Sequence, residues 1–347
     1  MRSPIAILLA TAILSAQAQG HHSDAGLDLD SLATIEGTVT EFSWRNPHVY
    51  FTVETTDERG ERIAWTVQMA SVATVSRMGW ARDSLQVGDR VRVGAYPARD
   101  GRRYGKFLSI ERDGGPELPT SFDSSGEVRL AGPQATAIAS SLEGRWMADA
   151  EQIVSYPGRI DGLTRALLTL TEAGEAAQTA YDENSSENPE LSCIGRPTPA
   201  MIVYTDIYPM GIELNEAEEI IYIRGQFFDE ERTVYMDGRE HPGAAERFHE
   251  GHSIGWWEGE TLVVDTTNFA DHRSPYQNGI PSGPRKHVVE RYRLSDDRKG
   301  MIVEFMLEDP DYIAAPMTHT RELVYTPDAD MSPFNCDLES TRRFLSE

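Results

Sequence analysis

The chain has 347 residues with 32 basic and 56 acidic side chains, so its formal net charge at pH 7 is −24. This acidic excess argues against binding to nucleic acid or to anionic membrane surfaces, because both need clustered Lys and Arg. The length predicts two domains, and 39% hydrophobic with 25% charged residues is typical of globular proteins.

Residues 1–20 have the organisation of a secretory signal peptide. Arg2 precedes a short apolar run, 5–14, and small residues follow it. The run is shorter than the roughly 20 apolar residues that a membrane-spanning helix needs, and no later stretch comes close to that length. The sequence therefore predicts a periplasmic or secreted protein that is cleaved after Ala18 or Gly20 and is not an integral membrane protein.

Residues 30–113 have the pattern of a small β-barrel. Five short stretches alternate apolar and polar residues, and a stretch of helical or turn character, 71–85, separates the third from the fourth. This number and order of elements favour an OB-type barrel. The five predicted strands are 34–44, 48–56, 62–70, 88–98 and 100–112.

Residues 114–140 are rich in Gly, Pro, Ser and Ala without a sustained period, which predicts a linker. Residues 141–347 form a second β-rich region, where turn signals separate about eight strands. Their close spacing predicts a larger antiparallel barrel or sandwich, and an eight-stranded barrel can hold one small ligand. The predicted strands are 165–171, 201–208, 212–226, 231–238, 252–269, 287–295, 301–309 and 318–327.

The only two cysteines are Cys193 and Cys336. An even pair in an exported chain can oxidise, so we expect one disulfide that connects the region near residue 190 to the C-terminal end. A metal site with only two thiolates is the less favoured alternative.

The N-terminal half resembles a family of bacterial exported proteins of unknown function. The resemblance rests on His21-His22-Ser23 and on the stretches "IEGTVTEFSWRNPHVYFTV" (35–53), "GWARDSLQVGDRVRV" (79–93) and "DGRRYGKFLSI" (100–110). The family is described as small β-barrel domains, so the resemblance implies a fold and no particular activity.

The C-terminal half is similar to a second uncharacterised exported family. The matching stretches are "RTVYMDGREHP" (232–242), "GHSIGWWEGETLVVDTTNF" (251–269), "HVVERYRL" (287–294) and "MLEDPDYIAAPMTHTREL" (306–323). In addition, "GRW" at 144–146 is similar to the Gly-x-Trp that opens a lipocalin barrel, which is a hint about topology alone.

The histidines next to the predicted cleavage point have copper chemistry. Cleavage after Ala18 makes His21 the third residue, so that the terminal amine, two backbone amides and an imidazole can bind Cu(II) or Ni(II) in a plane. Cleavage after Gly20 makes His21 the first residue, whose amine and imidazole can chelate a metal together with His48 or His22. The alternative, which we favour, is a chain terminus without a function.

Several titratable residues of the second region could act as an acid and a base. Asp265 lies between apolar residues, so it is predicted to be either a buried carboxylate with a raised pKa or one paired with Arg291 or Arg321. A structural role, such as a hydrogen bond between strands, is the alternative for each of them. The candidates are His252, Asp265, His287, Glu290 and His319.

Aromatic side chains could form the walls of an apolar pocket. Trp256 and Trp257 should point to opposite faces of a strand, which places one of them in the core or pocket and the other outside. An exposed Trp could stack on a sugar or lipid, and core packing is the default alternative. The candidate ligand-binding residues are Trp256, Trp257, Tyr235 and Tyr292, and Phe269 and Phe305 are further aromatics of this kind.

The sequence has no H-E-x-x-H or C-x-x-C motif and no glycine-rich nucleotide loop. The favoured hypothesis is an exported protein that binds a small ligand in the second domain. One alternative is an enzyme of the barrel interior that uses His252 with Asp265 or Glu290. The others are a copper-binding protein and a scaffold for a partner in the cell envelope.

Overall fold

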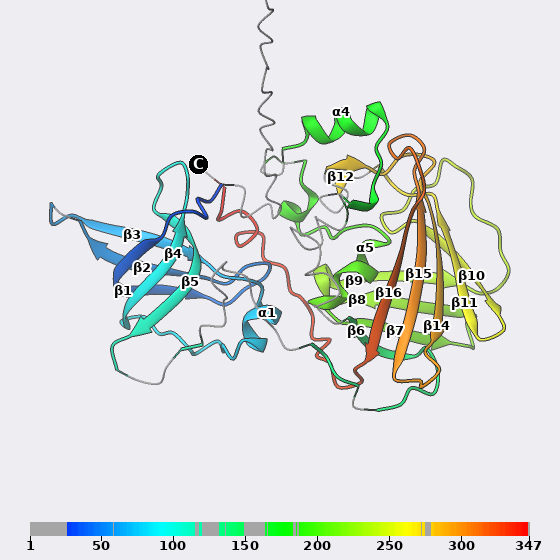
Figure 1. Cartoon of the computed structure of the whole chain (residues 1–347), viewed down its shortest axis with the longest axis horizontal. Coiled ribbons are helices and arrows are strands. Elements are labelled where there is room, and N and C mark those ends of the chain that lie inside the picture. The colour runs from blue at the N-terminus through cyan, green and yellow to red at the C-terminus, as the bar shows by residue number, and fades with distance from the viewer. Residues whose placement is uncertain are drawn as a thin grey trace, which may run out of the picture.

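A computed structural model describes residues 26–57, 59–114, 118–119, 132–135, 137–148, 164, 166–182, 185, 187–271, 273–274 and 279–345. Within them the chain forms two closed β-barrels, a smaller one followed by a larger one (Figure 1). The predicted fold class is confirmed, with a barrel rather than a sandwich as the second unit. The predicted signal peptide and most of the predicted linker lie outside the described residues. None of the described helices is long and apolar enough to cross a membrane.

The smaller barrel has the strand order β1-β2-β3-β5-β4, and β1 pairs with β4 to close it. Helix α1 (Val72–Arg77) lies between β3 and β4, and the Ser71 hydroxyl caps it by accepting a hydrogen bond from the Thr74 N–H. Inward side chains at every second position of the strands fill the interior, as the alternation predicts. The strands are β1 (Ala33–Ser43), β2 (Tyr50–Thr56), β3 (Arg62–Gln68), β4 (Arg90–Pro97) and β5 (Tyr104–Arg112).

The larger barrel has the strand order β10-β11-β14-β15-β16-β6-β7-β8-β9. All neighbours in this order are antiparallel, and a short parallel contact between β9 and β10 closes the ring. The strands are β6 (Gly144–Ala148), β7 (Met210–Asn215), β8 (Ile220–Gly225), β9 (Glu230–Tyr235), β10 (His252–Glu258), β11 (Thr261–Thr267), β14 (His287–Leu294), β15 (Gly300–Glu308) and β16 (Met317–Tyr325).

Small elements connect these strands. A two-stranded sheet pairs β12 with β13, and helix α4 begins after Thr171, whose hydroxyl accepts a hydrogen bond from the Gly174 N–H. The elements are α4 (Glu172–Ala180), η1 (Pro189–Ser192), α5 (Ala200–Val203), η2 (Tyr204–Asp206), η3 (Phe227–Asp229), β12 (Arg273–Ser274) and β13 (Ile280–Pro281).

Two strands predicted in the second region are wrong, and the predicted stretches 212–226 and 252–269 are each a pair of strands, β7 with β8 and β10 with β11. Residues 201–208 form α5 and η2, and the described part of 165–171 contains helical residues followed by a single bridge from Leu170 to Ile313. Residues 200–206 are buried throughout. A short, continuously apolar run has no period that distinguishes a strand from a buried helix, so the pattern alone could not decide.

The C-terminal segment, residues 326–345, leaves β16 and runs between the two barrels (Figure 1). The predicted disulfide between Cys193 and Cys336 is confirmed, with a Cα–Cα distance of 5.8 Å. Beside it, the Asn46 side-chain amide of the smaller barrel donates a hydrogen bond to the Phe334 carbonyl. The disulfide therefore holds the segment to the residue that follows η1 in the second region, and the hydrogen bond from Asn46 connects it to the smaller barrel.

Candidate functional site

The wall of the larger barrel opens between β9 and β10. These strands pair only at Val234 with Ser253 and at Tyr235 with Ile254. Just before β10, Gly251 has φ of 77°, and a Cβ atom there would lie 2.6 Å from a methyl group of Thr266. This left-handed turn, which favours glycine, directs the preceding chain away from β9.

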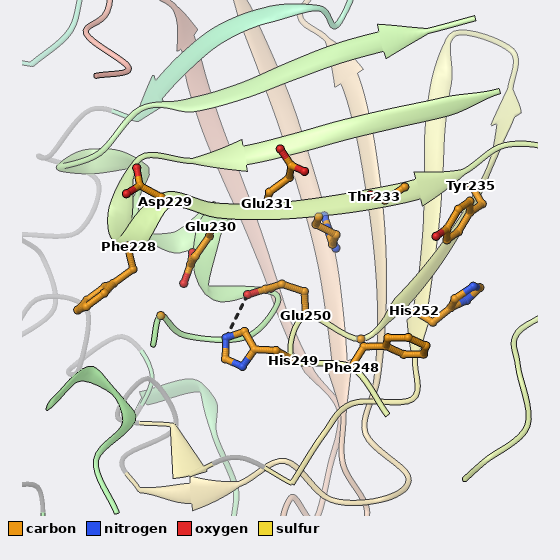
Figure 2. A pocket seen from close by; sticks show the side chains of 13 residues that line it. Phe228, Asp229, Glu230, Glu231, Thr233, Tyr235, Phe248, His249, Glu250 and His252 are labelled. Carbon is orange, nitrogen blue, oxygen red and sulfur yellow. Dashed lines mark ion pairs between the residues drawn. The ribbon is translucent and has the colours of Figure 1, made fainter. Parts of the chain in front are cut away.

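A pocket of about 450 Å³ fills this opening. Figure 2 shows β9 along one side of the pocket and the residues that precede β10 along the other. Both inward and outward residues of β9 line it, because the pocket lies along the edge of the strand. The lining residues are Gly195, Phe228, Asp229, Glu230, Glu231, Arg232, Thr233, Tyr235, Phe248, His249, Glu250, Gly251 and His252.

Two glutamates from opposite sides, Glu230 and Glu250, direct their carboxyl groups into the pocket (Figure 2). Glu230 is 7% exposed and accepts a hydrogen bond from the backbone N–H of Arg196 at 2.6 Å. Glu250 accepts hydrogen bonds from the backbone N–H and the hydroxyl of Thr198, at 2.8 and 2.9 Å, and forms an ion pair of 3.4 Å with His249. Burial, followed by the negative charge of Glu250, raises the pKa of Glu230 well above its usual range.

Arg232 is the only guanidinium among the residues that line the pocket, and other groups already neutralise it. It donates to a carboxylate oxygen of Glu290 at 2.6 Å and to the hydroxyl of Tyr292 at 3.0 Å, and all three side chains are buried in the barrel interior. Burial raises the pKa of Glu290 although Arg232 opposes the shift. Among the charged lining residues, carboxylates therefore dominate the field of the pocket.

Lys286 is buried near the pocket without lining it. Its Nζ lies 4.3 Å from the ring centre of Phe269 and donates to the hydroxyl of Ser282. Burial lowers the pKa of Lys286 to about 8, although Asp309 and Glu250 favour its charged form.

A row of hydrogen-bonded side chains lies at the rim of the pocket, on the outer face of the barrel. The two oxygens of Asp265 lie 2.9 Å from Nε2 of His241 and 2.9 Å from Nε2 of His287. The Nδ1 atoms of His241 and His252 lie 3.0 Å apart, and the ring of His252 stacks on Tyr235. Asp265 thereby fixes two imidazoles, one of which contacts the pocket residue His252.

Protonation states along this row follow from its contacts. The hydrogen bond to Asp265 raises the pKa of His287, whereas burial and then the charge of His241 lower the pKa of His252. Burial opposes the charge of Asp265, but its hydrogen bonds to His287 and His241 prevail and lower its pKa. His252 is therefore favoured as the neutral imidazole, and Asp265 as the carboxylate. This arrangement can accept and pass on a proton.

The predicted acid and base residues thus separate into two groups. His252, Asp265 and His287 lie together on the outer face, while Glu290 is fully buried in the interior. The hypothesis of an acid–base pair within the barrel interior does not match this placement, because alternation along β11 and β14 directs Asp265 outward and Glu290 inward.

The predicted arginine partners of Asp265 lie elsewhere. Arg291 pairs with Glu258 at 2.6 Å on the surface, and Arg321 is buried in the interior, 3.8 Å from Asp206. His319 also lies in the interior region, where its ring contacts Phe305, and burial lowers its pKa to about 4.

Of the predicted aromatic ligand-binding residues, only Tyr235 lines the pocket, and Tyr292 lies behind it. Trp256 and Trp257 are both exposed, at 41% and 47%, so the expectation that one of them packs in the core is wrong. They lie at the end of the β10–β11 hairpin beyond the last residue that pairs with β9, where one side of β10 has no neighbouring strand among the described residues.

The predicted copper ligands His21 and His22 lie outside the described residues. His48 lies in the smaller barrel, where its Nδ1 accepts a hydrogen bond from the side-chain amide of Gln68 and its ring contacts Tyr50 and Phe344. Within the described part of the chain, no three His, Cys, Asp or Glu side chains are arranged to hold a metal ion.

Residues 9–107 match a family of unknown function, DUF6152. The match includes most of the smaller barrel and ends before the larger barrel begins. No curated protein matches the chain. The comparisons therefore support an uncharacterised family for the N-terminal part and assign no activity to the pocket.

Sequence reasoning missed the residues at the centre of the pocket. Alternation along β9 places Glu230 and Arg232 on the same face as buried Val234, which was a signal for inward charges. His249 and Glu250 directly precede Gly251, just before β10, and such a group of titratable residues beside a turn was a second signal. His241 had no sequence signal, since only the fold brings it to Asp265.

Proposed function

We propose that the larger barrel binds a small organic cation in the pocket between β9 and residues 248–252. The observation that carries this proposal is the pair of glutamates, Glu230 and Glu250, directed into the pocket from opposite sides. A volume of about 450 Å³ is in the range of small-molecule sites. The proposal makes the favoured hypothesis from the sequence more specific.

The electrostatics favour a cation over an anion or a neutral ligand. Burial and the charge of Glu250 raise the pKa of Glu230 although Arg196 opposes the shift, so the compensation of its negative charge by Arg196 is incomplete. A bound ammonium or guanidinium group would supply that compensation and would favour the carboxylate form. The aromatic rings of Phe228 and Phe248 offer further favourable contacts to a cation and its apolar part, whereas the ring of Tyr235 already contacts Arg239 and His252.

The test uses n-butylammonium, with 1-butanol as the neutral control of similar shape, in titration calorimetry at pH 7. We expect butylammonium to bind at least about tenfold more tightly, since charge-assisted hydrogen bonds contribute about 1.5–3 kcal/mol each. Glu230→Gln and Glu250→Gln should remove this preference. Glu260→Gln, in the exposed β10–β11 turn, is the matched control. Equal binding of the two probes would contradict the proposal.

Proton release offers an independent readout. If the cation favours ionised Glu230, binding near the raised pKa of that group releases protons, and the measured enthalpy then depends on the ionisation enthalpy of the buffer. Glu230→Gln should abolish this buffer dependence. The proposed site of action is the periplasm or the exterior, on the basis of the predicted signal peptide.

Acid–base catalysis at the pocket rim is the second candidate. It is supported by the hydrogen-bonded row from Asp265 through His241 to the pocket residue His252. In this role His252 is the base, and the other two are positioning residues. Its test is mass spectrometry of ligands recovered from the protein. Chemical conversion of the ligand by the wild type that is lost in His252→Gln would support catalysis. Recovery of only unconverted ligand from the wild type would support binding without catalysis.

A further inference from the structure

The pocket contains an open strand edge. β9 pairs with β8 along its whole length, Glu230–Tyr235, but with β10 only through Val234 and Tyr235. In an antiparallel pair, alternate residues direct their N–H and C=O groups away from the partner strand. Within 230–233 these groups therefore face the pocket, and among the described residues no second strand pairs with them.

The opening is built into the fold. If the chain before β10 continued straight, it would pair with 230–233 and complete the barrel wall. Instead Gly251 turns it away, and Phe248 pairs with Phe269 on the far side of the opening. Exposed strand edges are normally covered or blocked because they accept further strands. Here the edge borders a pocket with charged and aromatic walls.

We propose that the natural ligand is a short extended peptide segment that adds to the edge of β9 at 231–233 and places a Lys or Arg side chain between Glu230 and Glu250. This inference rests on the proposed cation site and names its ligand class. Main-chain hydrogen bonds to an open edge supply affinity, and pockets for alternate side chains supply specificity.

The alternation of side chains fixes the arrangement. Glu230 and Arg232 point inward from β9, whereas Glu231 and Thr233 point outward. A peptide residue that points inward lies opposite Arg232, whose guanidinium is already held by Glu290 and Tyr292, and extends its basic group past it to Glu230 and Glu250. Its two neighbours point outward, on the side of Glu231 and Thr233. The two outward side chains of the peptide would meet no buried charged group. The site therefore selects a basic side chain at the inward position alone.

The length of the opening limits the number of residues in the segment that can bind there. It spans four residues, 230–233, between the η3 turn and the first β9–β10 pair. At about 3.3 Å per residue it takes a segment of three or four residues. Strand exchange with a long edge of a second copy would meet the closed wall on either side, so a short segment is favoured.

The experiment compares three probes on the full-length chain by titration calorimetry. The first is acetyl-Gly-Lys-Gly-amide, the second is the same peptide with both glycine nitrogens methylated, and the third is n-butylammonium, which matches the lysine side chain. Two main-chain hydrogen bonds predict that the first peptide binds about ten- to thirtyfold more tightly than butylammonium. Methylation should return the affinity to that of butylammonium.

Amide hydrogen exchange shows where on the protein the peptide binds. The first peptide should slow exchange within 231–233 of β9, and butylammonium should not. Equal affinities of all three probes, or no added protection of these amides, would overturn the peptide proposal and leave the cation site standing. Failure of butylammonium to bind, with peptide binding intact, would refute the cation site and with it this inference. The same peptide with norleucine in place of Lys should bind more weakly than the first peptide. Equal binding of these two peptides would also refute the cation site and this inference.

Discussion

Removal of the disulfide offers a direct test of how the C-terminal segment is held against the rest of the second region. The perturbation is the double substitution Cys193→Ala and Cys336→Ala. The bond joins the residue after η1 to the C-terminal segment over a sequence separation of 143 residues. Both cysteines are paired, so the double variant leaves no free thiol.

The magnitude follows from the length of the loop. The chain-entropy relation, −2.1 − 1.5R ln n with n of 143, gives about −17 cal/mol/K, or about 5 kcal/mol at 25 °C. Measured losses for native disulfides are typically about 2–5 kcal/mol, because the unfolded chain retains structure. We therefore expect the free energy of unfolding to fall by about 2–5 kcal/mol.

The effect should also reach the smaller barrel. The C-terminal segment contacts it through Asn46, through the ion pairs of Arg45 with Asp337 and Glu339, and through the hydrogen bond from Ser340 to the His48 carbonyl. In the double variant only noncovalent contacts, these polar ones and the packing of Phe334 and Phe344, hold the segment. Hydrogen exchange within 334–345 should therefore become faster.

Urea unfolding followed by circular dichroism, together with hydrogen exchange, measures both effects. Wild-type protein treated with a reductant should reproduce the double variant. Arg45→Ala is the matched control, because it removes exposed ion pairs to the same segment and should cost less than about 1 kcal/mol. A loss below about 1 kcal/mol in the double variant, with the bond verified by mass in the wild type, would refute the reasoning.

Three further predictions concern the pocket and its rim. Glu230→Gln should become more stable relative to the wild type as the pH rises from about 4.5 to 8, because the raised pKa of Glu230 makes wild-type stability fall between the pKa of the unfolded chain and that of the folded protein; parallel melting curves of the two proteins from pH 4 to 8 would contradict this. Gly251→Ala should destabilise by about 2–4 kcal/mol in urea unfolding, since φ is 77° and the new methyl group meets Thr266; a loss below about 0.5 kcal/mol would show that the turn is not required. Asp265→Asn should lower the pKa of His287 in an NMR titration, because the carboxylate raises it, and an unchanged value would refute the hydrogen-bonded row.

Local patterns were sufficient for the smaller barrel. Its five strands and the helix between the third and fourth agree with the predicted stretches, because each strand buries one face and so alternates clearly. Where burial is complete, as in residues 201–208, the period disappears and the predicted strand is a helix. The disulfide was predictable because the chain has only two cysteines.

The candidate site was predictable only in part. His252, Asp265 and His287 were chosen from their strand contexts. In the structure His287 contacts Asp265 directly, and His241, a residue 24 positions before Asp265, connects Asp265 to His252. Glu290 was chosen from the same strand as His287, but the strand period of two places it on the other face, where Arg232 neutralises it. Its partner comes from β9, which is distant in sequence.

The sequence by itself determined the fold class, the disulfide and the acidic character of the chain, because alternation, composition and cysteine number are local or additive properties. Tertiary structure alone decided where the barrel wall opens, since this depends on the departure of the chain from β9 at Gly251. It also decided that Glu230 and Glu250 share one pocket. Their interaction depends on distance in space and on exclusion of water, and neither quantity is encoded in the spacing of residues along the chain.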